Sequence, residues 1–510
     1  MTVLSKMAFA PTASEPLPIA GLLLGIFIIY RVGVVIYRLY FHPLAKFPGP
    51  KLYAASYVPF LYYDKYKGEF SKTTLALHEK YGPFVRITPN RLAVDSAISN
   101  PEVLARPASR PEFGKTTEFY GLSKRVGIAT ATKDDHRSQR RLLAHAFSES
   151  ALREQEAIIR QYIDTFIAKI NDHAVAGQPV NVVEWFNFMT FDVIGDMAFG
   201  DPFGSLQSGV YHPWIAMIFQ GIQFNGLFQI MMRYKWLGLL MALSPRARHL
   251  TKGAKENIEL SYEKTEKRIA LGADAREDFM THILRHNKDG SRMTHEDIHK
   301  NAELLILGGS ETTATALSGL FFFLTRSENQ RVRQTLLEEV RSAFSSPESI
   351  TMVSTAPLSY LSACLEEVLR MFPPAAETPP RVSPGDYVAG QYIPKDTIVS
   401  TYQIAAHYSP KHFRNPEQFV PERWLPAAHP LHDSKYDSDT RAAFKPFSAG
   451  PRDCVGKNLA YAEMRVVVSL LMWHFDVEAL PGQDDWIEKQ RIFTVWEKGP
   501  LLMRFSPRKV

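Results

Sequence analysis

One loop near the carboxyl end constrains this 510-residue chain more than any other segment. It runs from Phe447 to Gly456 and contains Cys454, one of only two cysteines in the sequence. Gly450 and Gly456 lack a Cβ atom, which lets a backbone turn tightly and approach a flat group closely. An isolated cysteine is most often a buried structural residue. Arg452 and the two glycines at these offsets instead favour a cysteine that acts as a metal ligand.

The residues of this loop suit a haem iron that is held by a single thiolate. Such a ligand pushes electron density toward the iron and favours cleavage of an O–O bond. We expect the sulfur of Cys454 to be buried and to accept hydrogen bonds from backbone N–H groups. We also expect Phe447 to pack against the sulfur side of the ring, and Arg452 to bind a haem propionate.

The loop resembles the cysteine-ligand signature of the cytochrome P-450 family, Phe-x-x-Gly-x-Arg-x-Cys-x-Gly. The matching residues are Phe447, Gly450, Arg452, Cys454 and Gly456. The resemblance implies that haem b (iron protoporphyrin IX) is the cofactor and that Cys454 is the axial ligand of its iron. It also implies that further motifs occur in a fixed order along the chain.

A long helix is expected from Thr294 to about Thr325. Thr294 followed by Asp297 is the pattern of an N-terminal cap, and roughly 30 helical residues span roughly 45 Å. Gly308 and Gly309 lie in its middle, where each glycine costs about 1 kcal/mol relative to alanine. This cost indicates a packing or functional reason, such as a kink that makes room for a ligand.

Glu311 and Thr312 follow these glycines, and an acid beside a hydroxyl is suited to relaying protons. The segment resembles the family motif Ala/Gly-Gly-x-Asp/Glu-Thr-Thr/Ser. By that resemblance both residues are catalytic: Thr312 hydrogen-bonds dioxygen and Glu311 feeds the proton chain. The alternatives are a buried helix with incidental polar residues or a second membrane span. The span is disfavoured because Glu303 and Glu311 would lie in lipid.

A second helix is expected over 358–372, ended by two prolines. Glu367 and Arg370 share one face of it, as an exposed ion pair also would. The pair resembles the Glu-x-x-Arg helix of the family, and Arg423 lies in a segment that resembles Pro-Glu-Arg-Phe/Trp. The ordered motifs together imply a buried structural triad of Glu367, Arg370 and Arg423.

The resemblance also implies further haem-binding residues. His136 and Arg140 occupy the positions of a Trp-x-x-x-Arg motif, with histidine in place of tryptophan. Arg381 matches an arginine that leads into a strand beneath the edge of the haem. For Arg137 and Arg141 we favour a solvated basic face, which contributes to docking an electron donor.

The amino terminus predicts a membrane anchor. Leu17 to Tyr37 is almost wholly apolar, and about 20 residues cross a bilayer core. No cleavage site for a signal peptidase follows it. The basic residues Arg38, Lys46 and Lys51 come after the span and favour a cytoplasmic catalytic domain. We therefore expect a single-pass protein of the endoplasmic reticulum.

The chain is predicted to form one large domain that is mainly α with small β-sheets (α+β), the cytochrome P-450 fold, with an N-terminal transmembrane helix. Length alone suggests about three domains, yet the motifs must converge on one haem. We divide the chain into an anchor (1–40), a stiff proline-rich hinge (41–50) and a haem-thiolate domain (51–510). A net charge of +6 and a pI of about 9.0 suit anionic lipid and an acidic reductase, and are too small to suggest nucleic acid.

The substrate pocket is expected to be apolar and to accept a lipophilic small molecule. Ile215–Leu243 would cover it and dip into the membrane, although ordinary core packing is the simpler reading of any one residue. The other candidate pocket residues are Phe119, Tyr120 and Val126, Phe219–Phe228, Ala375–Thr378, and Phe493–Trp496.

The motifs together predict a monooxygenase that inserts one oxygen atom of O₂ into its substrate. Lys133–Ser148 and Phe41–Pro50 most resemble fungal microsomal members that modify secondary metabolites. Because the chain has no convincing flavin or nicotinamide fingerprint, electrons would come from NADPH through a separate NADPH-cytochrome P-450 reductase. The alternatives are a reductase-independent haem-thiolate isomerase or dehydratase, which the Glu311–Thr312 pair disfavours, and a membrane-tethered haem carrier or sensor.

Overall fold

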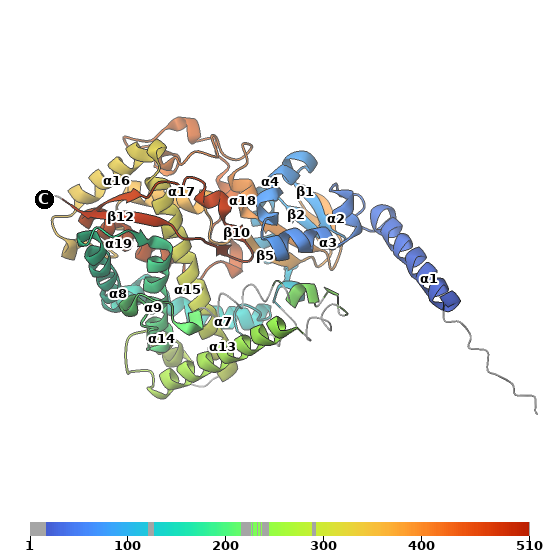
Figure 1. Cartoon of the computed structure of the whole chain (residues 1–510), viewed down its shortest axis with the longest axis horizontal. Coiled ribbons are helices and arrows are strands. Elements are labelled where there is room, and N and C mark those ends of the chain that lie inside the picture. Colours follow the sequence, from blue (N-terminus) through green and yellow to red (C-terminus); the bar gives the residue numbers. More distant parts are fainter. Residues whose placement is uncertain are drawn as a thin grey trace, which may run out of the picture.

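The protein is mainly helical with small sheets, as the sequence predicts (Figure 1). The computed structural model describes residues 17–120, 127–215, 226, 228–231, 233–234, 236, 244–287 and 292–508. The helices are α1 (Leu17–Ile36), α2 (Lys51–Ala55), α3 (Val58–Phe60), α4 (Phe70–Tyr81), α5 (Ser96–Ser99), α6 (Thr117–Tyr120), α7 (Lys133–Ala146), α8 (Glu149–Val175), α9 (Val182–Phe199), α10 (Ser205–Ser208), α13 (Pro245–Ala270), α14 (Phe279–His286), α15 (His295–Leu324), α16 (Gln330–Ala343), α17 (Ser359–Met371), α18 (Gln403–His407), α19 (Lys457–His474) and α20 (Trp486–Lys489).

The strands form small sheets at the edges of the helical body. The largest has the order β1-β2-β8-β5-β3, a second has the order β4-β12-β9, and β6-β7 and β10-β11 are hairpins. Their bounds are β1 (Phe84–Thr88), β2 (Arg91–Val94), β3 (Gly114–Lys115), β4 (Val180–Asn181), β5 (Glu377–Val382), β6 (Asp386–Val388), β7 (Gln391–Ile393), β8 (Ile398–Tyr402), β9 (Phe475–Ala479), β10 (Arg491–Ile492), β11 (Trp496–Glu497) and β12 (Leu502–Pro507).

Helix α15 runs through the middle of the helical body (Figure 1). It begins with the expected capping box: the Thr294 hydroxyl accepts from the Asp297 N–H at 3.1 Å, and the Asp297 carboxylate accepts from the Thr294 N–H at 3.0 Å. The helix is continuous to Leu324, so the two central glycines cause no break. A Cβ on Gly309 would lie 2.6 Å from the Ile194 side chain of α9. Close packing against α9 is therefore the reason for this glycine, while Gly308 has open space around it.

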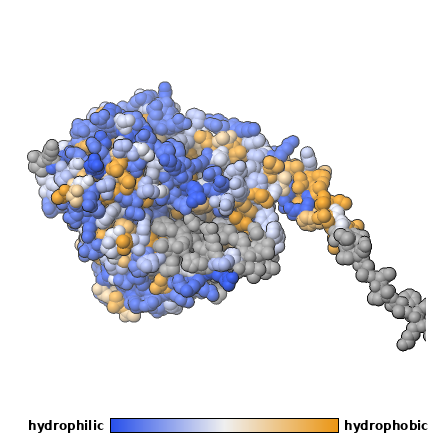
Figure 2. Space-filling view, viewed as in Figure 1, coloured by the Kyte–Doolittle hydropathy of each residue, from blue (hydrophilic) through white to orange (hydrophobic). Residues whose placement is uncertain are grey.

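Helix α1 projects away from the globular body (Figure 1), and its surface is apolar (Figure 2). By length and composition Gly21–Phe41 can cross a membrane, and none of it is buried against the rest of the protein. The helix continues into η1 (Tyr37–Phe41), a π-helical turn. It is the candidate transmembrane anchor that the sequence predicts.

The proline-rich segment 41–50 does not form a separate spacer. Leu44 and Phe47 are buried in an apolar cluster with strands β1 and β2. The Arg86 N–H of β1 donates to the Pro48 carbonyl at 2.7 Å, and a Cβ on Gly49 would lie 2.3 Å from the Arg86 carbonyl oxygen. Burial of the apolar side chains that lie between the prolines thus holds this segment against the sheet.

Candidate active site

The cysteine loop is shaped by one glycine and one backbone hydrogen bond. Gly450 has φ +78°, and a Cβ there would lie 2.3 Å from the Leu104 carbonyl oxygen, so both conformation and space require glycine. The Cys454 N–H donates to the Phe447 carbonyl at 2.9 Å, which closes the loop. Gly456 has ordinary φ and a Cβ there would lie 4.0 Å from Sγ of Cys454, so glycine only leaves space beside the sulfur.

The Cys454 thiol lies at the start of helix α19. The residue is exposed, although protein surrounds the thiol closely enough for burial to raise its pKa. The Gly456 N–H is the largest influence that lowers this pKa, followed by Arg140. The Phe447 ring packs against Tyr461 of α19, with centroids 5.1 Å apart. The burial of the sulfur beneath a bound haem stays a prediction.

A cluster of cations lies beside this loop. The antiparallel register of β3 and β5 places Lys115 directly opposite Arg381, although like charges at such positions destabilise a sheet. Burial, and then the charge of Arg452, lower the pKa of Lys115 to about 6. Arg381 Nη1 is buried without a hydrogen-bond partner, and Arg452 pairs with Glu112. Arg381 and Arg452 together carry more positive charge than Glu112 balances, so this cluster fits an anion.

Helix α7 brings His136 and Arg140 to the same cluster. His136 is buried, and burial followed by the charge of Arg452 lowers its pKa to about 3, so its imidazole is neutral at pH 7. Arg140 donates to both the carbonyl and the carboxylate of Asp453, the latter at 2.7 Å. Arg140 thus binds the cysteine loop directly, through the residue before Cys454.

Glu311 and Thr312 lie in different surroundings on helix α15. The Thr312 hydroxyl is half-buried and donates to the Gly308 carbonyl at 2.7 Å. Glu311 is 1% exposed and forms an ion pair with Lys498, which is 2% exposed and also donates to Thr315 at 2.7 Å. Burial raises the pKa of Glu311, and Lys498 opposes this shift. One carboxylate oxygen of Glu311 has no hydrogen-bond partner.

Glu367, Arg370 and Arg423 meet in a fully buried network. Arg370 donates to both oxygens of Glu367, at 2.8 and 2.9 Å, and Arg423 Nε donates to the same carboxylate at 3.1 Å. Arg423 also pairs with Asp439, which the sequence analysis missed. The arginines hold the pKa of Glu367 below its usual value although burial acts in the opposite direction. Two carboxylates therefore balance two guanidinium groups in the interior.

A comparison with known proteins identifies the family. A family model described as Cytochrome P450 matches residues 48–503. The chain belongs to the cytochrome P450 family. The cytochrome P450 monooxygenase aclL of Aspergillus oryzae is 40% identical over 94% of this chain and 96% of its own length. The trichothecene C-15 hydroxylase of Fusarium sporotrichioides is 39% identical over 96% and 99% of the two chains.

Membership confirms the predicted fold class and enzyme class. The chain has the cytochrome P450 fold and is an oxidoreductase that incorporates oxygen, similar to fungal monooxygenases of secondary metabolism. A third relative, the averantin hydroxylase of Dothistroma septosporum, is 35% identical over 96% of this chain and 91% of its own length. The family implies a haem iron as the cofactor.

The residues of the site fit a haem. A haem carries two propionates, and the guanidinium groups of Arg381 and Arg452 offer charge-assisted donors for them. The neutral imidazole of His136 lies beside these arginines and offers a further hydrogen-bonding group for a propionate. Cys454 would hold the iron, with the Gly456 N–H directed at the sulfur. Bound haem supplies the redox-active iron at which this family activates O₂.

The expected pocket residues separate into different environments. Trp496 belongs to the core rather than to a pocket surface: its indole donates to the Pro373 carbonyl at 2.7 Å, and its ring lies 4.1 Å from that of Phe372. Phe119 and Tyr120 on α6 and Phe493 are half-buried, whereas Thr378 is buried. Val126, most of Phe219–Phe228 and most of Ile215–Leu243 lie outside the described residues.

Lys498→Met should make stability depend more steeply on pH. Without its partner, the buried Glu311 carboxyl has its pKa raised further, and a group with a raised folded pKa loses its stabilising effect as pH rises through that value. The thermal unfolding midpoint of the variant should therefore fall, relative to wild type, as the pH rises above the usual pKa range of a glutamic acid.

Two further variants test this assignment by the same unfolding measurements. Glu311→Gln combined with Lys498→Met should remove the added pH dependence, because no carboxyl is left to titrate. The exposed Lys489→Met should match wild type. An unchanged pH profile in Lys498→Met would show that the ion pair does not control the Glu311 carboxyl.

Proposed function

We propose that this cytochrome P450 inserts one oxygen atom of O₂ into a lipophilic intermediate of fungal secondary metabolism, by hydroxylation, epoxidation or successive oxidations. The observation that carries the proposal is the buried Glu311–Lys498 pair, one residue from the half-buried Thr312 hydroxyl. A haem-thiolate enzyme needs such an acid and hydroxyl when it must deliver protons to oxygen. Two similar proteins are named hydroxylases, which supports the same class of reaction.

The residues around the haem would divide the work between binding and proton transfer. Cys454 would bind the iron, while Arg381 and Arg452 would fix the propionates and so the orientation of the ring. Thr312 would position a proton donor on the substrate side. Glu311 would pass protons toward Thr312. In the ion-paired state only one oxygen of Glu311 is free of partners, so the carboxyl group would first have to separate from Lys498.

The electron source is part of the proposal: NADPH through a separate NADPH-cytochrome P-450 reductase. Net charge +6 supports docking to an acidic partner. Compounds that shift the haem absorption spectrum should be incubated with reductase, NADPH and ¹⁸O₂. We expect one ¹⁸O atom per oxidation step in the product. Conversion without reductase and NADPH, or a product without ¹⁸O, would favour the isomerase or dehydratase alternative instead.

Thr312→Ala should separate NADPH consumption from product formation. The substitution removes the hydroxyl that donates a hydrogen bond to the Gly308 carbonyl. This disturbs proton delivery but leaves the haem-binding residues unchanged. We expect product per NADPH to fall about 100-fold, the lower end of a general acid–base contribution. Thr313→Val, a buried neighbour, serves as the matched control and should keep wild-type coupling. Equal coupling in Thr312→Ala and wild type would exclude Thr312 from the relay.

For location, we infer a single-pass protein of the endoplasmic reticulum with its catalytic domain in the cytoplasm. The exposed apolar helix α1 supports a membrane anchor, and the basic residues after it support this orientation. Protease treatment of sealed microsomes tests it: the catalytic domain should be digested without detergent. Protection until detergent is added would place the domain in the lumen.

A further inference from the structure

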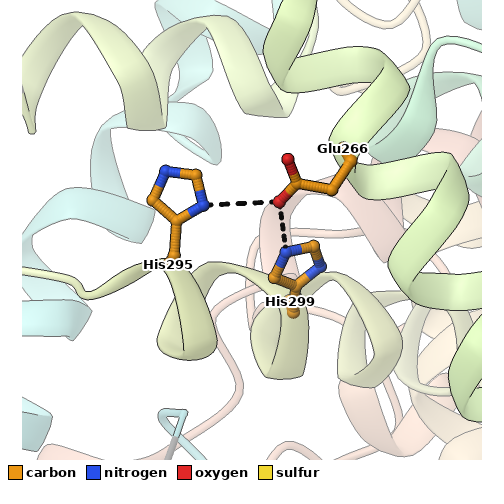
Figure 3. A group of neighbouring side chains, drawn as sticks. All are labelled: Glu266, His295 and His299. Atoms are coloured by element: carbon orange, nitrogen blue, oxygen red, sulfur yellow. Dashed lines mark hydrogen bonds and ion pairs between the residues drawn. The ribbon is translucent and has the colours of Figure 1, made fainter.

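Three potential metal ligands meet where helix α13 packs on the first turns of helix α15 (Figure 3). Glu266 comes from α13, and His295 and His299 come from α15. The Glu266 Oε1 atom lies 2.7 Å from His299 Nε2 and 3.3 Å from His295 Nδ1. All three ligand atoms lie within 4.8 Å of one another. None of these residues belongs to the haem site described above.

The two histidines are spaced to act on one ion. Residues four apart on a helix lie on the same face, so His295 and His299 present their imidazoles on successive turns. The His299 ring is held in place by Tyr262 of α13, which stacks on it with a centroid distance of 3.7 Å and an interplanar angle of 11°. His299 is 6% exposed, and its Nδ1 has no hydrogen-bond partner.

We propose that Glu266, His295 and His299 bind a divalent transition-metal ion, with Zn²⁺ as the physiological candidate. Zn²⁺ takes imidazole nitrogens at about 2.0–2.1 Å and carboxylate oxygens at about 2.0–2.2 Å in a tetrahedral arrangement. Small side-chain adjustments convert the present distances to that geometry. Ca²⁺ and Mg²⁺ prefer sets of oxygen ligands, so two imidazoles select against them.

The site is open enough for an ion to enter and for water to complete its coordination. His295 is exposed and Glu266 is partly exposed, while His299 closes the buried side. The carboxylate of Glu296 lies in the same first turn of α15 and is exposed. The nearby ammonium of Lys300 is paired with Glu303, which reduces its repulsion of a cation.

Such an ion would join helix α13 to helix α15 in addition to the packing contact between the two helices. Helix α13 directly follows the segment that we expect to cover the substrate pocket, and α15 carries Glu311 and Thr312. Bound metal would therefore restrain helix α13 relative to the catalytic helix. Anything that binds only the folded state also stabilises it by mass action.

The test is a calorimetric titration of ZnCl₂ into the full-length holoenzyme, purified without a polyhistidine tag and freed of metal by dialysis against chelator. We expect one saturable site, and a higher unfolding temperature that EDTA reverses. His295→Ala and His299→Ala should each weaken binding at this site at least about 100-fold, more than loss of an outer-shell partner costs. MgCl₂ at the same concentration should produce neither effect.

Matched variants distinguish this site from other surface groups. Glu296→Gln removes a carboxylate from the same turn and should bind Zn²⁺ as wild type does. Glu154, Glu277 and His282 form the other candidate ligand group among the described residues, so His282→Ala tests whether binding occurs there instead. The carbon-monoxide spectrum and circular dichroism of each variant verify folding. Unchanged stoichiometry and affinity in the His295→Ala/His299→Ala double variant would overturn the proposal, as would loss of the site in His282→Ala alone.

Discussion

Cys454→Ser should abolish the red-shifted absorption band of the carbon-monoxide complex and reduce turnover below detection. A neutral hydroxyl donates far less electron density to iron than a thiolate, so the chemistry that defines this family fails even where some haem remains bound. The surrounding loop should persist, because its shape depends on Gly450 and on the hydrogen bond from the backbone N–H of residue 454. The reduced carbon-monoxide difference spectrum measures the effect directly.

The second cysteine provides the matched control for this experiment. Cys364 is buried in α17, where surrounding apolar residues raise the pKa of its thiol well above the usual value. Cys364→Ser should therefore cost some stability but keep the full red-shifted band. If the band survives in Cys454→Ser, or disappears only in Cys364→Ser, our assignment of the iron ligand is wrong.

Glu367→Gln should lower the free energy of unfolding by about 3–5 kcal/mol, the usual cost of removing one partner of a buried ion pair. The substitution leaves Arg370 and Arg423 in the interior, where Asp439 is the one acidic partner that remains among the residues that the structure describes. It also replaces one of the two accepting oxygens with an NH2 group, which would face guanidinium N–H donors. Because whole proteins are typically stable by only about 5–15 kcal/mol, we expect a low yield of holoenzyme.

The adjacent carboxyl group tests whether burial of the network explains this loss. Glu366 precedes Glu367 on α17, but it accepts a hydrogen bond from Tyr461 at 2.7 Å, and no arginine among the described residues forms an ion pair with it. Glu366→Gln should cost less than about 1.5 kcal/mol, the value of an ordinary hydrogen bond. Urea unfolding followed by circular dichroism compares both variants with wild type. Equal losses of unfolding free energy in the two variants would show that the arginine network contributes no more than an ordinary hydrogen bond.

Local sequence signals predicted the elements that depend on neighbouring residues. The cap at Thr294 and the proline stop after Phe372 set the ends of α15 and α17 within a residue of the expected positions. The glycines around Cys454 predicted a tight backbone turn, and the structure adds why Gly450 is needed there. For the two helix ends the determining contacts are local, whereas the need for Gly450 comes from the distant Leu104 carbonyl.

The rest of the site depends on contacts between segments far apart in the sequence. Lys498 reaches Glu311 across 187 positions, and no local pattern distinguishes it from a solvated surface lysine. Lys115 meets Arg381 only because β3 pairs with β5. Asp439 joins the arginine network through a loop that reads as polar surface. Single-sequence reasoning lacks the register and packing that bring such charges together.

The attachment of the proline-rich segment to strand β1 has a practical consequence for producing a soluble form of this enzyme. Removing everything before residue 51 would take away the Pro48 carbonyl that accepts the Arg86 N–H, the Arg38 carbonyl that accepts the Arg86 guanidinium at 2.7 Å, and the apolar side chains of Leu44 and Phe47. Arg86 would lose two of its acceptors, and the apolar side chains of Phe84, Leu92 and Val94, which pack with Leu44 and Phe47, would become exposed and prone to aggregation. An expression boundary at Tyr37 deletes the apolar helix while retaining all of these contacts.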